Sequence, residues 1–152
     1  MAVRVFSGVE ELQASVGEHL GFSEWLTITQ DRIDAFADAT GDHQWIHVDP
    51  ERAADGPFGT TIAHGFLTLS LMPVFGQQVY RIDGVKAALN YGSDKVRFIA
   101  PVPVGSRLRG GVLLKAVTPT ALGFQMATTI TIELEGSDKP ACVIEMLVVL
   151  VP

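Results

Sequence analysis

Two side chains suited to acid–base chemistry lie five residues apart in the segment Gly41–Asp49. Asp42 follows a glycine expected to stop a helix, and His47 comes shortly after it. A histidine titrates near neutral pH and a carboxylate can share its proton, so this pair could bind and activate one water molecule. A simpler interpretation stays open, in which Asp42 is a turn residue at the helix end and His47 is a packing histidine.

A second feature with chemical potential follows at Ala63–Phe66, where a long apolar segment begins. Backbone N–H groups in the first turn of a helix lack acceptors within the helix and can donate to an anion or an oxyanion. Gly65 leaves space there for a ligand to approach, although a glycine also permits close helix packing. The sequence therefore offers a candidate acid–base pair and a candidate oxyanion donor.

The elements that must position these residues begin with helices. Thr29 can cap a helix in which Ile33, Phe36, Ala37 and Thr40 share one face, and Gly41 ends it. The nearly uncharged segment Ile62–Tyr80 predicts a helix that other structure must surround. Before and between them, the pattern predicts a short amphipathic helix at Val9–Val16, a strand at Phe22–Ile28, and a mainly irregular segment 42–61 with at most one helical turn at Pro50–Ala54.

Strand patterns separated by turn signals occupy the chain after Gly84. In Leu122–Leu134, Phe124 and every second residue after it fall on one face, which predicts one buried and one solvated side. Helices followed by an antiparallel sheet indicate an α+β fold, here a single domain over residues 1–152. The predicted strands are Val85–Tyr91, Lys95–Ile99, Arg107–Val117, Leu122–Leu134 and Ala141–Val151.

Composition excludes several classes of partner. A net charge of −6 and only 11 Lys and Arg residues argue against a nucleic-acid surface, which needs clustered cations. Glycine and proline interrupt Ile62–Tyr80, which favours a buried helix over a membrane span. The N-terminus lacks the pattern of a signal peptide, and the single Cys142 lies in an apolar run. We expect a cytoplasmic protein with no membrane partner.

Several blocks in one order carry a family resemblance. The pattern Phe36-x-x-x-Thr40-Gly41-Asp42-x-x-x-x-His47-x5-Ala53, followed by Ala63-His64-Gly65, resembles the hydratase 2 motif of the MaoC-like dehydratase family, whose members are (R)-specific enoyl-CoA hydratases. Downstream, Asn90-Tyr91-Gly92, Lys95–Phe98 and Pro101–Gly105 are similar to a small single-domain bacterial branch that includes nodulation-protein-N-like proteins. The resemblance covers nearly the whole chain.

The resemblance implies a hot dog fold, in which a curved antiparallel sheet wraps a long central helix. It implies a homodimer paired edge to edge, with the active site near the interface and an acyl-CoA or acyl-carrier-protein thioester as substrate. Asp42 and His47 would be the catalytic pair, and the Gly65 amide would polarise the thioester carbonyl. One departure is Gln44-Trp45 in place of the family's common Asn-Pro, which we expect to alter the loop or the acyl pocket.

Further residues are weaker candidates for binding substrate. Asn90 could orient the catalytic loop or contact the thioester, or it could be a polar residue at a strand end. Trp45 could border an acyl tunnel with Phe58, Phe66 and Phe75, although aromatic residues in such places are commonly core. His64 adjoins the candidate oxyanion donor. Arg97, with Lys95 and Arg107, could meet the phosphates of coenzyme A, or could only solvate the surface.

No cofactor or metal is expected, because the spacing of His43, His47 and His64 matches no common zinc signature and no cysteine assists them. Two rival functions stay open beside hydration. A hot dog thioesterase would bind the same acyl-CoA and direct water at the carbonyl carbon. A binding protein for acyl thioesters, or for a protein partner, would keep the dimer and lack turnover, since a fold does not determine a function.

Overall fold

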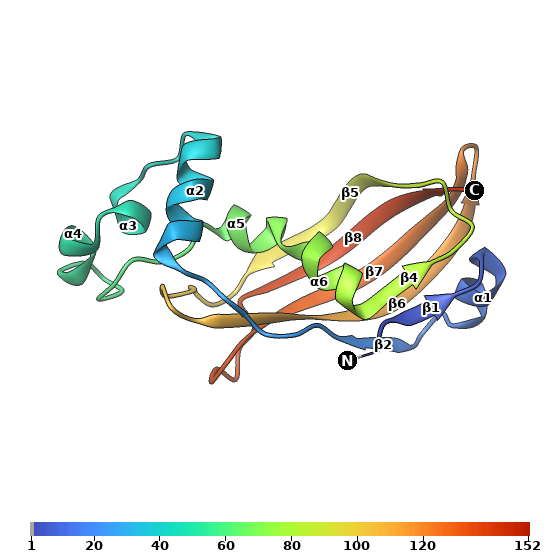
Figure 1. The fold of residues 1–152 in the computed structure, drawn as a ribbon, viewed down its shortest axis with the longest axis horizontal. Helices are drawn as coiled ribbons and strands as arrows, with labels where there is room; N and C mark the ends of the chain where they lie inside the picture. Colours follow the sequence, from blue (N-terminus) through green and yellow to red (C-terminus); the bar gives the residue numbers. More distant parts are fainter. Residues whose placement is uncertain (1) are drawn as a thin grey trace.

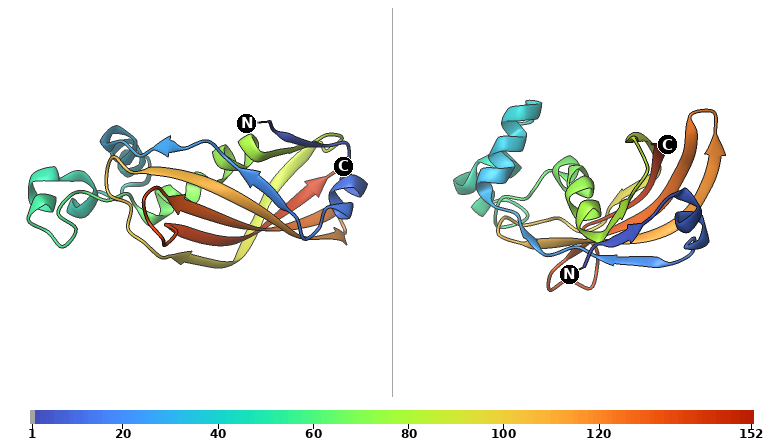
Figure 2. Two further views of the ribbon diagram at one scale, coloured as in Figure 1. Left: turned by 90° about the horizontal axis from the view of Figure 1, so that it is seen from below. Right: turned by 45° about the vertical axis from the view of Figure 1, so that its right-hand side comes forward.

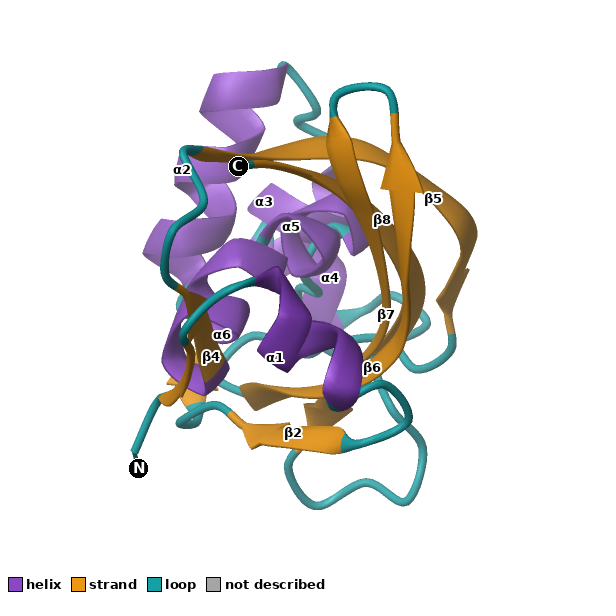
Figure 3. Cartoon of the chain, turned by 90° about the vertical axis from the view of Figure 1, so that its right-hand side faces the viewer, coloured by secondary structure: helices purple, strands orange, loops and turns teal. Residues whose placement is uncertain are grey.

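A curved antiparallel sheet surrounds two short helices in the computed structural model, which describes residues 2–152. Figure 1 shows the strands side by side, and Figure 3 shows the sheet curving around the helices. The order across the sheet is β2-β6-β7-β8-β5, and β3 also pairs with β6. These strands are β2 (His19–Phe22), β3 (Leu26–Thr27), β5 (Ala87–Phe98), β6 (Arg107–Thr120), β7 (Gly123–Leu134) and β8 (Cys142–Val151).

The central helix is shorter than predicted and divided in two, α5 (Gly65–Ser70) and α6 (Met72–Val79). The prediction of one helix over Ile62–Tyr80 was therefore wrong in extent. Pro73 has no N–H to continue the hydrogen bonding of α5, so the second helix starts afresh around it. Helix α5 begins later than the predicted Ile62 because Ile62 is in extended conformation and forms a β-bridge with Pro103. Within the described residues, no helix combines the length and the hydropathy needed to cross a membrane.

The concave face of the sheet and the central helices form the core. Alternate residues of β7 are buried as predicted, with Met126, Thr128, Ile130 and Ile132 all facing inward. On the helix side, Phe75 is fully buried and lies against β6. A Cβ atom at Gly110 would come within 2.7 Å of the Phe75 Cβ, so a glycine at this position allows α6 to approach the sheet closely.

Several strand boundaries differ from the prediction. The expected strand Phe22–Ile28 is interrupted between β2 and β3, although Ser23 still bonds Gly110 through both its backbone and its hydroxyl. The two strands expected at Val85–Tyr91 and Lys95–Ile99 form one strand, β5. Its pairing with β8 shifts register twice, between Asn90 and Gly92 and between Ser93 and Lys95. A small parallel sheet of β1 (Arg4–Phe6) and β4 (Tyr80–Ile82) was not predicted, because strands this short leave no periodicity.

Three helices form a cap beyond one end of the sheet, shown at the left of Figure 1 and in Figure 2. They are α2 (Gln30–Thr40), α3 (Trp45–Val48) and α4 (Pro50–Ala54). The predicted ends of α2 are confirmed, since the Thr29 hydroxyl accepts from the Arg32 N–H and Gly41 adopts a left-handed conformation. Helix α3 was not predicted. At the far end, the predicted N-terminal helix is α1 (Val9–Ala14).

The close packing of α6 on β6 gives a stability prediction. Gly110→Ala places a methyl group against Phe75 and should lower the free energy of unfolding by about 1–3 kcal/mol, because overpacking forces the helix or the strand to shift. Thermal or urea unfolding measures this. Gly92→Ala is the matched control, since a Cβ at that strand position meets no atom within 4 Å. Equal unfolding midpoints for both variants would contradict the proposed contact.

Candidate active site

Asp42, His47 and His64 converge where the cap meets the central helix. One oxygen of the Asp42 carboxylate and one ring nitrogen of each histidine lie within 4.8 Å of one another. The two histidines are buried and Asp42 is exposed. The cluster therefore has a solvent-facing carboxylate above two enclosed imidazoles, and it includes both members of the predicted catalytic pair.

The backbone of Ile62 orients His47. The Nδ1 atom of His47 lies 2.7 Å from the Ile62 carbonyl oxygen, which can only accept a hydrogen bond, so Nδ1 carries the proton. In the neutral ring Nε2 then has the free lone pair and can accept a proton. Helix α3 supplies this orientation, because it turns His47 inward while its other three residues are only half-buried. The simpler interpretation of His47 as a buried, satisfied histidine describes only its Nδ1 side.

His64 holds the catalytic loop from the opposite side. Its Nε2–H donates to the Asp42 carbonyl oxygen at 3.0 Å, and its ring stacks on His47 with centroids 3.9 Å apart. Phe36 covers the same ring at 4.8 Å between centroids. The Nδ1 atom of His64 is buried and has no hydrogen-bond partner among residues 2–152. His64 thus contacts both Asp42 and His47, and it presents an unused acceptor beside them.

Asp42 combines both of the interpretations that the sequence left open. Its Oδ1 accepts from the Gln44 N–H at 3.3 Å, which is the hydrogen bond of a turn residue. The same carboxylate is part of the cluster with the two imidazoles. The turn therefore places the carboxylate beside His47 instead of excluding it from the site.

Gln30 ties the cap to the site, a role that sequence reasoning missed. Its amide nitrogen donates to the His47 carbonyl at 2.8 Å, and its amide oxygen accepts from the Thr61 hydroxyl at 2.6 Å. One side chain thereby connects α2, α3 and the segment that enters the central helix. No sequence signal marks it, because a glutamine in the first turn of a helix is ordinarily exposed.

Gly65 is the first residue of α5, directly after His64. Its position is partly exposed, and a Cβ there would lie 3.1 Å from the ring of Phe98 on β5. The absence of a side chain at Gly65 therefore lets the Phe98 ring of β5 pack closely against the start of α5. The predicted oxyanion donor and the predicted acid–base pair lie at the same end of the central helix.

A metal ion is a chemical alternative for this cluster, because carboxylate and imidazole are ligands for transition metals. The two rings are stacked with an interplanar angle of 23°, so their lone pairs lie in two nearly parallel planes, which is an unfavourable arrangement for two ligands of one ion. The hydrogen bond from His64 to the Asp42 carbonyl also fixes the loop that carries Asp42, so any shift of the two residues to bind an ion would have to move this loop. The arrangement suits proton transfer better than metal ligation.

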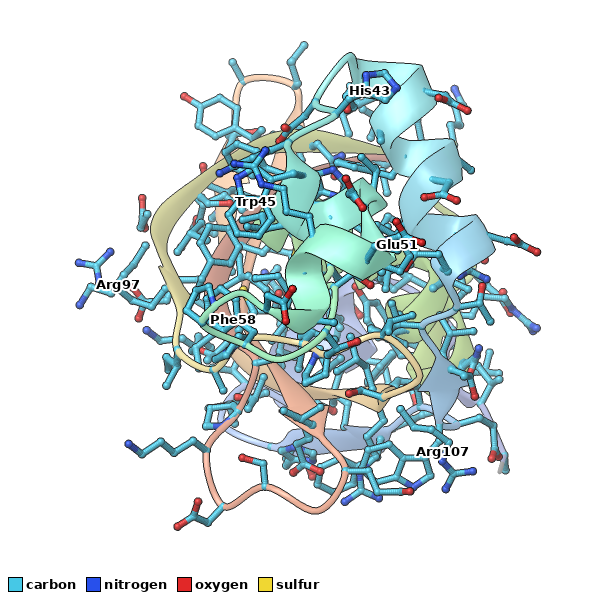
Figure 4. All side chains as sticks on the ribbon, turned by 90° about the vertical axis from the view of Figure 1, so that its left-hand side faces the viewer. His43, Trp45, Glu51, Phe58, Arg97 and Arg107 are labelled. Atoms are coloured by element: carbon cyan, nitrogen blue, oxygen red, sulfur yellow. The ribbon has the colours of Figure 1, made fainter. Side chains whose placement is uncertain are left out.

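The remaining predicted substrate contacts lie outside the cluster. Trp45 packs within the cap, with the Arg52 guanidinium 4.4 Å from its ring centroid and Gly56 beneath it. Figure 4 shows Arg97 pointing outward on one side and Arg107 on another, so these cations do not gather around one phosphate position. Asn90 lines a cavity between α6 and the sheet.

That cavity has a volume of about 430 Å³ and extends along the central helix. Helix α6 contributes Met72, Pro73 and Gly76 to its wall, and the sheet contributes mainly methionine and branched aliphatic side chains. A mostly apolar cavity of this size is typical of a site for a small organic molecule. The sheet side of the wall consists of Ala87, Ala88, Asn90, Met126, Thr128, Ile130, Met146, Val148 and Leu150.

Comparison with known protein families shows which family this chain resembles. The family model described as the MaoC-like domain matches residues 11–134. The chain belongs to the MaoC-like dehydratase family. The matched range contains the whole cluster, the central helices and most of the sheet.

Relatives of this MaoC-like chain include named dehydratases. The chain is 59% identical over 147 residues to 3-hydroxyacyl-thioester dehydratase Z of Mycobacterium tuberculosis, covering 96% of this chain and 97% of the relative. It is 47% identical over 134 residues to nodulation protein N of Rhizobium leguminosarum bv. viciae, covering 86% and 83%. The resemblance to both groups that the motifs indicated is therefore confirmed.

A solved structure supports the fold. The (R)-hydratase from A. caviae involved in PHA biosynthesis superposes with a TM-score of 0.74 and 27% identity, over 90% of this chain and 96% of that one. The hot dog fold expected for the MaoC-like chain is confirmed, with the central helix in two segments.

The hydrogen bonds of the cluster predict the tautomers of its imidazoles. Neutral His47 should carry its proton on Nδ1 and neutral His64 on Nε2, because each of these atoms faces a backbone carbonyl. Long-range proton–nitrogen NMR spectra of the labelled protein distinguish the two forms. A His47 ring protonated on Nε2 would mean that the nitrogen assigned to proton transfer is already occupied.

Proposed function

We propose that this MaoC-like protein is an (R)-specific enoyl-CoA hydratase, which adds water to a trans-2-enoyl thioester to give a 3-hydroxyacyl thioester and catalyses the reverse dehydration. The observation that carries the proposal is the convergence of the Asp42 carboxylate with the imidazoles of His47 and His64, directly before Gly65. Its relationship to 3-hydroxyacyl-thioester dehydratase Z supports the same chemistry.

In the proposed reaction Asp42 and His47 hold one water molecule. His47 Nε2 removes a proton from it as the oxygen bonds to carbon 3, and the same proton is returned to carbon 2. General acid–base assistance of this kind typically contributes about 10²–10⁴-fold to the rate. The hydrogen bond from Nδ1 to the Ile62 carbonyl stabilises the positively charged imidazole that forms between the two steps.

Attack at carbon 3 moves negative charge onto the thioester oxygen, which needs a donor already in place. The Gly65 N–H, at the start of α5, has this role in the proposal. Such a donor typically contributes about 3 kcal/mol of transition-state stabilisation. The acyl chain then extends along the central helix into the cavity lined by Met72 and Gly76.

The active unit that we propose is a homodimer paired through β5. This strand ends the sheet, so one of its edges has no partner among residues 2–152. Large apolar side chains are exposed on it and beside it, and Phe66 packs edge to face on Phe98 directly after Gly65. A second copy would cover this surface and enclose the site. The exposed residues are Phe66, Leu89, Tyr91, Phe98 and Ile99.

We also propose that the protein is cytoplasmic. The proposal is supported by Cys142, a buried free thiol whose pKa is raised to about 11 by burial. Such a thiol behaves as a small apolar side chain.

Substitution of the catalytic pair tests the mechanism. Asp42→Asn and His47→Gln should each lower kcat/KM for hydration by about 10²–10⁴-fold with an unchanged fold, because the water loses its base or its orientation. Loss of the conjugated-enoyl absorbance of crotonyl-CoA measures hydration, and circular dichroism checks the fold. His43→Gln is the matched control, because His43 is exposed and bonds Asp38, whose carboxylate raises the pKa of His43.

A free-thiol assay run beside it separates the rival functions. Hydration removes the absorbance without releasing thiol, a thioesterase releases thiol, and a binding protein does neither. Turnover in His47→Gln close to that of the unmodified protein would remove His47 from the mechanism.

The proposed interface gives a separate prediction. Leu89→Asp should convert the dimer to a monomer, because it places a charge at a surface that must be buried, where Leu89 is 50% exposed in the single chain. Sedimentation velocity measures the change. Leu122→Asp is the control, since Leu122 is 68% exposed on the turn between β6 and β7. A dimer that survives the Leu89 substitution would place the interface elsewhere.

A further inference from the structure

The cavity beside α6 contains polar groups that a hydrocarbon chain would leave unpaired. Thr128 and Tyr80 both line it, and neither hydroxyl makes a hydrogen bond to any of residues 2–152. On β7 and β8 the other lining residues are methionine, isoleucine, valine and leucine, and the remaining polar lining residues are Gln77, Arg81, Lys86 and Asn90. Two unpaired hydroxyls in such surroundings are a chemical feature that the hydration step does not use.

Thr128 lies in the middle of β7 on the concave face, between Met126 and Ile130. It is only 2% exposed, and its backbone groups are engaged in pairing with β6 and β8. Valine has nearly the same shape and would suit an apolar wall at this position. On the inner face of β7, the Thr128 hydroxyl is therefore the polar group that lies between the apolar side chains of Met126 and Ile130.

Tyr80 closes the cavity where α6 ends and β4 begins. Its ring lies beside Gly76, another wall residue, at 3.9 Å from the position a Cβ atom would take there. Burial raises the pKa of Tyr80, so its hydroxyl stays protonated and available as a donor. Tyr80 reaches the cavity from the helix side, and Thr128 reaches it from the sheet side.

A buried hydroxyl without a partner destabilises the occupied site, because desolvation is not offset by a new hydrogen bond. A plain acyl chain that fills the cavity would desolvate both groups in this way. A chain that carries its own hydroxyl or carbonyl oxygen would pair with them. Sites built to bond a ligand oxygen discriminate against analogues that lack it.

We propose that Thr128 and Tyr80 form a polar subsite that selects acyl thioesters bearing a hydroxyl or carbonyl group on the chain, away from the reacting carbons. The cavity's identity as the acyl site rests on the proposed hydratase function. The two hydroxyls then determine which acyl chains bind well, and the Asp42 and His47 chemistry is the same for all of them.

Binding measured without turnover tests this subsite. The ligands are saturated acyl-CoA thioesters of increasing chain length, each with and without a terminal hydroxyl, titrated calorimetrically into the unmodified dimer. At the length that brings the hydroxyl to the subsite, the hydroxylated ligand should bind about five- to tenfold more tightly than its plain counterpart, as expected for one net hydrogen bond. At shorter lengths the preference should disappear.

Matched substitutions assign the effect to the two residues. Thr128→Val and Tyr80→Phe should each abolish the preference at that length and leave the affinity for plain chains equal or higher. Thr129→Val, on the opposite face of β7, should retain it. These substitutions preserve shape, and unfolding curves check that each variant is folded.

Equal affinity for hydroxylated and plain ligands at every length would overturn the subsite, since water would then satisfy both groups equally well. A preference that survives both Thr128→Val and Tyr80→Phe would overturn it too. If the unmodified protein binds hydroxylated chains more tightly but hydrates no enoyl thioester, the proposed function would be contradicted and the subsite would be supported. The two ideas therefore fail in different measurements.

Discussion

The hydrogen bond from His47 Nδ1 to the Ile62 carbonyl is the interaction on which the site depends. It fixes the ring orientation and reserves Nε2 for proton transfer. The Ile62 carbonyl is itself held because Ile62 bridges to Pro103 and its N–H donates to the Ile46 carbonyl. The segment before the central helix is thus extended backbone bound to both the connection between β5 and β6 and the cap, and the late start of α5 follows from the same constraint.

The cap and the core meet at this segment, and separate hydrogen bonds connect each of them to the site. Gln30 connects α2 to α3 and to Thr61, and His64 connects the central helix to the Asp42 loop. Preorganised groups of this kind lower the reorganisation needed at the moment of reaction. The sheet contributes through Gly110, which lets Phe75 approach and so sets the position of α6 and the wall of the cavity.

Sequence reasoning reached the catalytic candidates because their chemistry is local. Asp42 and His47 lie on one loop, the helix stop at Gly41 places them, and the motif extends to Gly65. The alternation in β7 likewise predicted its buried face. What sequence could not supply arises from contacts between distant segments: Gln30 bonded to Thr61, the stacking of His64 on His47, the break at Pro73, and the meeting of Thr128 with Tyr80 around one cavity. Trp45 packs against Arg52 within the cap and Arg97 points outward, so their contacts with substrate stay predictions.

The most direct test of the account is a crystal structure of the Asp42→Asn variant with a trans-2-enoyl-CoA bound. The account predicts a water molecule near carbon 3, within about 2.6–3.2 Å of His47 Nε2 and of the side chain at position 42, with the thioester oxygen accepting from the Gly65 N–H. A thioester oxygen bound elsewhere, or a carbon 3 out of reach of any water held by His47, would contradict it.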